Sequence, residues 1–184
     1  ANVLSKLEDY LQTEWPELDV YLTSVTDHFA TISVCGPNSK KIVSTVIDDL
    51  DFSDENFPHM TFKNAKIGKI NCRVMRISFT GELSYEINVQ ANYAKSVWEK
   101  CMEAGKDFNI TPYGTETMHL LRAEKGFIIV GQDTDGTMTP VDLQMDWIVS
   151  KKKYDFIGKR SLYRSDTIRE DRKQLVGLLT DNPE

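Results

Sequence analysis

The side chains that most often carry chemistry are few and scattered in this chain of 184 residues. Three histidines and three cysteines share no spacing that would gather them as metal ligands; they are His28, His59, His119, Cys35, Cys72 and Cys101. No C-x-x-C pair, G-x-S-x-G elbow or Cys–His arrangement identifies a nucleophile. Neither G-x-G-x-x-G nor G-x-x-x-x-G-K-[ST] occurs, so nucleotide binding by these fingerprints is unsupported. The sequence therefore predicts no metal site.

One glutamate is distinguished by its place in a strand. Residues 83–89 alternate between apolar and polar side chains, which predicts a half-buried strand. Glu86 lies on the polar face of that strand, where most glutamates are simply solvated. This pattern alone favours a solvated Glu86. Glu82, beside Gly81, is expected to belong to the turn before the strand.

The elements that must position these side chains alternate irregularly along the chain. Periodicity predicts helices over residues 2–15, 37–50, 93–108 and 111–125. It predicts strands over residues 20–25, 29–34, 67–70, 72–79, 83–89 and 174–180. Antiparallel strand pairs mixed with helices, without regular βαβ alternation, predict an α+β fold.

Composition limits the partners of the chain. With 40% hydrophobic and 27% charged residues, it has the make-up of a folded domain and not of a disordered or collagen-like one. A net charge of −6 argues against a nucleic-acid partner. No run of roughly 20 apolar residues and no signal-peptide pattern occurs, so we expect no membrane partner. The three isolated cysteines fit a reducing compartment, which predicts a cytoplasmic protein.

An ordered set of short segments carries a family resemblance. Four of them are V-C-G-P at residues 34–37, F-T-G-E-L-S-Y-E-I at 79–87, L-R-A-E-K-G at 121–126 and D-F-I-G-K-R at 155–160. In this order they resemble the aminomethyltransferase family, typified by the glycine cleavage T-protein. Three further runs, at 11–16, 110–119 and 126–135, resemble its branch in the C-terminal folate-binding region of sarcosine oxidase alpha subunits. The resemblance covers essentially the whole chain.

The resemblance implies a tetrahydrofolate site. The family anchors the pterin on the last glutamate of a T-G-E-x-x-x-E pattern, which is Glu86 here. A pterin edge presents a ring N–H beside an exocyclic amine, and one carboxylate accepts both donors together. The resemblance also implies that Phe79 packs its ring at the site, where many members have tyrosine. Met60 and Thr61 match a segment that lines the folate cavity.

The resemblance further implies a place in a larger enzyme. Heterotetrameric sarcosine oxidases demethylate sarcosine at a flavin held by another subunit, and the folate region captures the one-carbon unit as 5,10-methylenetetrahydrofolate. Other subunits are therefore expected as partners, with FAD, FMN and NAD bound only in other parts of that complex. The family's catalytic aspartate lies upstream of residue 1, so we expect no catalytic residue in this chain and no activity from it alone.

The chain ends suggest part of a longer protein, because it starts without Met inside a helical pattern and ends after a strand-like run. We expect residues 1–164 to be an N-terminally incomplete folate-binding domain, with an aminomethyltransferase-like fold of antiparallel strands and packed helices. Residues 165–184 are expected to begin a truncated C-terminal β-barrel with its first strand. The basic stretch at 151–164 could attract a polyglutamyl folate tail, although a solvated basic face is favoured.

Three other functions stay open at this point. One is a stand-alone aminomethyltransferase of glycine cleavage; Met118 stands where the T-protein has arginine, which suggests a different lining of the site. Another is a non-catalytic folate-binding accessory protein for iron–sulfur enzymes, with the signature K-G-C-Y-x-G-Q-E. Here Phe127 replaces its cysteine and the spacing is one residue too long. The last is a subunit-interface module that binds nothing by itself.

Overall fold

The computed structural model describes residues 2–179 and 181. The chain divides into two compact units, Ala1–Met118 and His119–Glu184, which are described separately. The domain limits expected from the resemblance, 1–164 and 165–184, stay a prediction, because these units reflect contacts alone.

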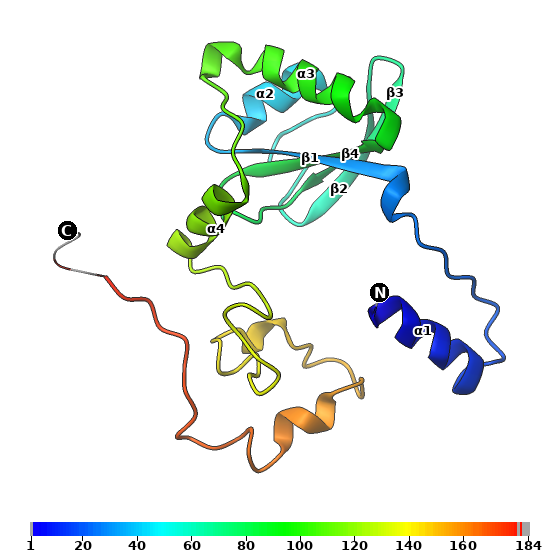
Figure 1. Ribbon diagram of the computed structural model, residues 1–184, viewed down its shortest axis with the longest axis vertical. Helices are drawn as coiled ribbons and strands as arrows, with labels where there is room; N and C mark the ends of the chain where they lie inside the picture. Colours follow the sequence, from blue (N-terminus) through cyan, green and yellow to red (C-terminus); the bar gives the residue numbers. More distant parts are fainter. Residues whose placement is uncertain (1, 180, 182–184) are drawn as a thin grey trace. The chain divides into compact units, whose positions relative to one another are not determined.

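The first unit is built on a four-stranded antiparallel sheet in the order β1-β4-β3-β2 (Figure 1). Its strands are β1 Phe29–Cys35, β2 Thr61–Ile67, β3 Ile70–Arg76 and β4 Ser84–Gln90. The first helix, α1, spans Asn2–Thr13 and ends before Pro16, which cannot continue a helix. Helices and an antiparallel sheet in one unit confirm the predicted α+β class.

The core of this unit lies between one face of the sheet and two helices, α2 Ser39–Val46 and α3 Ala94–Ala104 (Figure 1). Val43 of α2 and Val97 of α3 are fully buried. On β4, alternate residues Tyr85, Ile87 and Val89 are at most 1% exposed. The alternation predicted for residues 83–89 is therefore present, and its apolar side faces the helices.

Two of the strands expected in this unit are not formed. Residues 20–25 pair with no strand, and Val20, Tyr21 and Val25 are about half exposed or more. The β-forming side chains of this segment are therefore not part of a sheet. The strand expected at 67–70 is instead the tip of the β2–β3 hairpin, where Gly68 has a φ of 63°. Only glycine takes that conformation freely, so the chain reverses here.

The second unit has little regular structure. Helix α4, Thr115–Glu124, runs across the division between the units, and short 3₁₀ turns follow at Asp146–Ile148 and Lys159–Tyr163. Arg122, 8% exposed, is paired with Asp133.

A buried ion pair organises the end of the described chain. Asp142 is 2% exposed, and its carboxylate accepts the Arg172 Nε proton at 2.7 Å and the Thr139 amide at 2.7 Å. The Leu175 amide donates to the Asp142 carbonyl at 2.8 Å. Residues 174–179 form no strand, and Thr180 of the expected strand lies outside the described residues. The barrel therefore stays a prediction.

Candidate functional site

The sheet face turned away from α2 and α3 carries polar side chains in cross-strand rows. One row contains Ser33, Glu86, Met75 and Phe62, which are register partners from β1 to β2. Because neighbouring residues on a strand point to opposite faces, burial of Tyr85 and Ile87 in the core sets Glu86 on this open face. An acid thus stands on an inner strand of the sheet, with Ser33 on one side and Met75 on the other, and Phe62 lies beyond Met75.

The Glu86 carboxylate has no partner among the described residues. Its side chain is half-buried, and it forms no hydrogen bond or ion pair with any of them. Burial raises its pKa above the ordinary value for glutamate. A half-buried carboxylate without donors is costly to maintain, and it gains most from a ligand that brings N–H groups.

Tyr113 lies beside this row and was not predicted as a site residue. The Cys35 thiol donates to the Tyr113 hydroxyl oxygen at 3.3 Å. Burial, followed by the Cys35 hydrogen bond, raises the pKa of Tyr113 to about 12, and the charge of Glu86 adds to the rise. Tyr113 is therefore a neutral phenol at physiological pH. The sequence could have indicated Tyr113 as a site residue, because it lies within the run 110–119, which carries part of the family resemblance.

The other predicted site residues lie outside the Glu86 row. Thr61 begins β2 opposite Arg76, one position out of step with the Glu86 row, and its hydroxyl donates to the Pro58 carbonyl at 2.6 Å. Met60 is 73% exposed, with a φ of 63°. Phe79 is half exposed in the connection between β3 and β4. The sheet register therefore places Met75 next to Glu86, with Phe62 beyond it in the same row, and Thr61 outside that row.

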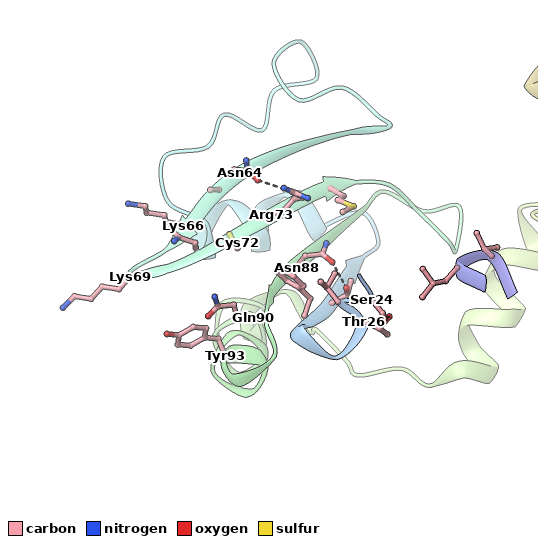
Figure 2. A pocket seen from close by; sticks show the side chains of 18 of the residues that line it. Ser24, Thr26, Asn64, Lys66, Lys69, Cys72, Arg73, Asn88, Gln90 and Tyr93 are labelled. Atoms are coloured by element: carbon pink, nitrogen blue, oxygen red, sulfur yellow. Dashed lines mark hydrogen bonds between the residues drawn. The ribbon is translucent and has the colours of Figure 1, made fainter. Parts of the chain in front are cut away.

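A second row lies next along the same face. It consists of Thr31, Asn88, Arg73 and Asn64, one from each strand. The Thr31 hydroxyl donates to Asn88 Oδ1 at 2.7 Å, and Arg73 Nε donates to Asn64 Oδ1 at 3.2 Å. All four line a cavity of about 1200 Å³, which Met75 also lines, and Figure 2 labels Asn64, Arg73 and Asn88 of this row. That volume is ample for a small organic ligand.

The cysteines give no nucleophile in the core. Burial raises the pKa values of Cys72 and Cys101 to about 11, which keeps both thiols protonated at neutral pH. Among residues 2–179 and 181, no three side chains of His, Cys, Asp or Glu gather as a metal site would need. Within the same residues, no helix is long and apolar enough to cross a membrane.

Comparison with known proteins identifies the family. A sequence model described as the GCVT N-terminal domain matches residues 1–153. The chain belongs to this family. The predicted membership of the aminomethyltransferase family is thereby confirmed, and with it the family's fold class.

Individual relatives give the position within the family. The chain is 57% identical over 180 residues to the sarcosine oxidase subunit alpha of Corynebacterium sp. strain P-1, covering 97% of this chain and 18% of that protein. It is 37% identical over 143 residues to an aminomethyltransferase of Halothermothrix orenii, covering 76% of this chain and 38% of that protein. A solved heterotetrameric sarcosine oxidase from Corynebacterium sp. U-96 aligns with a TM-score of 0.48 and 16% identity, over 59% of this chain and 54% of that one. The chain thus spans less than a fifth of the length of the first of these relatives.

Proposed function

We propose that this chain is the tetrahydrofolate-binding part of a sarcosine oxidase alpha subunit. Glu86 carries the proposal, because a half-buried carboxylate with no described partner stands on a polar sheet face in a member of the GCVT family. The donor-rich edge of a pterin supplies the two parallel N–H groups that such a carboxylate accepts.

The neighbouring side chains fit this ligand. Met75 lies beside Glu86 in its row, Phe62 lies beside Met75, and both offer apolar contact to a flat ring. Tyr113, held neutral, adds a polar hydroxyl at the β1 side of the row. We place Phe79 and the Met60–Thr61 pair at the rim of the site, where Phe79 and Met60 expose apolar surface.

The bound tetrahydrofolate would supply the nitrogens that take up the one-carbon unit, giving 5,10-methylenetetrahydrofolate. The residues of this chain bind and orient; no group here is assigned to proton transfer or to oxidation. The complete enzyme would oxidatively demethylate sarcosine with other subunits as partners, using FAD, FMN and NAD bound outside this chain. A cytoplasmic site of action is consistent with three free cysteines among the described residues.

The relatives favour this function over glycine cleavage. Identity to the sarcosine oxidase subunit is 57% over 97% of the chain, against 37% over 76% for the aminomethyltransferase. An accessory folate-binding protein is disfavoured by Phe127 at the cysteine position of that signature. Asp133, which stands at the position of the last glutamate of that signature, is also held in an ion pair with Arg122.

The experiment is a calorimetric titration of the full-length protein with tetrahydrofolate, followed by a sarcosine oxidation assay. We expect saturable binding, and sarcosine-dependent peroxide production by the assembled enzyme but not by the 184-residue chain. Binding without sarcosine oxidation in the assembled enzyme would favour the aminomethyltransferase alternative. Absence of binding would overturn the proposal and leave a subunit-interface module as the remaining interpretation of the chain.

A further inference from the structure

Tyr113 stands beside Glu86 without belonging to the sheet. It lies in the connection between α3 and α4, and its hydroxyl contacts Cys35 at the end of β1. Cys35 and Ser33 share the open face with Glu86, because strand residues two apart point to the same side. Tyr113 therefore adds a phenol to the β1 side of the Glu86 row.

Ser33 lies close to Glu86 on the neighbouring strand. The Gly36 amide donates to the Leu83 carbonyl at 2.8 Å, so the hydrogen-bonded pairs of β1 and β4 fall on every second residue from there. Ser33 and Glu86 form one of the pairs in between, in which the Cα atoms are only about 4.5 Å apart. A group that bonds to Ser33 is therefore near any ligand edge that Glu86 holds.

Two donors occupy the hydroxyl oxygen of Tyr113. The Cys35 thiol donates to it at 3.3 Å. Burial, followed by this hydrogen bond, raises the pKa of Tyr113 to about 12, whereas a hydrogen bond from Ser33 acts to lower it. A phenol oxygen has two lone pairs and one proton. With both lone pairs engaged, Tyr113 can only donate, and its proton meets no acceptor among residues 2–179 and 181.

Space for a ligand atom is present beside this hydroxyl. Ser33, Cys35 and Tyr113 line a cavity of about 470 Å³. The charge of Glu86 contributes to the raised pKa of Tyr113, so the two groups are within electrostatic reach, although no hydrogen bond joins these two described residues. The site thus offers an acceptor pair at Glu86 and a donor beside it at Tyr113.

A pterin presents the complementary order along one edge. Its exocyclic 2-amine and its ring N3–H donate, and the adjacent 4-oxo oxygen accepts. Glu86 can accept from the two donors, which leaves the 4-oxo oxygen for a neighbouring donor. We propose that Tyr113 donates its hydroxyl proton to the 4-oxo oxygen of the folate ring that Glu86 holds, and that this contact selects 2-amino-4-oxo rings. The inference rests on the proposed function and adds a specificity-determining residue to its site.

The test measures the loss of tetrahydrofolate affinity in Tyr113→Phe, by calorimetric titration of the full-length protein. Phenylalanine keeps the ring and removes the hydroxyl, so one hydrogen bond between neutral groups is lost. We expect Kd to weaken about three- to tenfold. The matched control is Tyr21→Phe, which removes an exposed hydroxyl from the unpaired segment 20–25 and should change Kd less than about twofold. Unfolding midpoints should verify that both variants fold.

Selectivity is tested with the 4-thioxo analogue of tetrahydrofolate. This analogue keeps the 2-amine and the ring N3–H for Glu86, but it offers sulfur, a weaker acceptor, to Tyr113. The wild-type protein should bind tetrahydrofolate about three- to tenfold more tightly than the analogue. Tyr113→Phe should bind the two ligands within about twofold of each other, because the donor that distinguishes them is gone.

The outcomes separate this inference from the proposed function. Normal binding of tetrahydrofolate to the wild-type protein, with an equal Kd in Tyr113→Phe, would overturn the role of Tyr113 alone. A preference for tetrahydrofolate over the analogue that persists in Tyr113→Phe, or an equal loss of affinity in Tyr21→Phe, would do the same. No binding of tetrahydrofolate to the wild-type protein would overturn the proposed function itself.

Discussion

Replacing Glu86 by glutamine should weaken tetrahydrofolate binding while leaving the fold intact. The substitution turns one acceptor oxygen into an N–H donor aimed at a ligand donor, so one hydrogen bond is lost and a repulsive contact appears. Removing one partner of a buried charged pair costs roughly 2–5 kcal/mol. Because Glu86 is half-buried and not fully enclosed, we expect the lower part of that range. A loss of about 2–3 kcal/mol corresponds to roughly a 30- to 150-fold weaker Kd.

The same substitution should not destabilise the chain. Glu86 has its pKa raised by burial, so its ionised form opposes folding, increasingly as pH rises from the ordinary glutamate value through the raised one. A neutral amide avoids that cost, and the free energy of unfolding at pH 7 should stay equal or increase. The matched control is Glu55→Gln, an exposed glutamate off the sheet, which should change Kd less than twofold. Equal losses in the two variants, by calorimetric titration of the full-length protein, would refute the assignment of Glu86.

Three further predictions follow from particular side chains. Tetrahydrofolate affinity should fall as pH is lowered through the raised pKa of Glu86, and the fall should begin at a higher pH than it would for an unshifted glutamate. Titrations at several pH values should show that Glu86→Gln abolishes this dependence. Tyr85→Phe should leave urea unfolding unchanged or slightly more stable, because the buried Tyr85 hydroxyl has no partner among the described residues; a loss above about 1 kcal/mol would reveal one. Arg172 lowers the pKa of Asp142, so this pair stabilises the second unit above the ordinary aspartate pKa and stops doing so as pH falls through the lowered value. Asp142→Asn should cost about 1–3 kcal/mol locally, seen as faster amide exchange at Leu175; unchanged exchange would contradict it.

Local patterning predicted the strand that carries the site. Residues 83–89 alternate strictly, and β4 spans Ser84–Gln90 with its apolar side buried. The hairpin tip was mispredicted for a local reason as well. Ile67 and Ile70 are apolar and close together, so they read as one strand, although Gly68 between them allows the reversal. The Gly68 amide also donates to Asp48 Oδ2 at 2.5 Å, a contact 20 residues away that sequence periodicity does not contain.

Which residues lie near Glu86 depends on strand pairing between segments that are distant in the sequence. Glu86 was identified through the family resemblance, since a solvated glutamate is the usual outcome on a polar strand face. Its neighbour Met75, and Phe62 beyond Met75, follow from the β3–β4 and β2–β3 registers, which no local pattern fixes. Thr61 lies next to Phe62 in sequence, yet the two-residue period of a strand places it out of step with the Glu86 row. The register thus puts Phe62 in the Glu86 row, and the role expected for Thr61 stays a prediction.

The central claim is that Glu86 accepts the donors of a folate ring, and its pKa in the full-length protein reports this most directly. Carbon-detected NMR of the glutamate carboxyl groups, with Glu86→Gln to assign the signal, would follow the titration with and without tetrahydrofolate. Hydrogen bonds to the charged form favour it, so the raised pKa of the free carboxyl should fall on saturation with the ligand. A pKa that stays the same or rises when the protein is saturated with tetrahydrofolate would contradict the account.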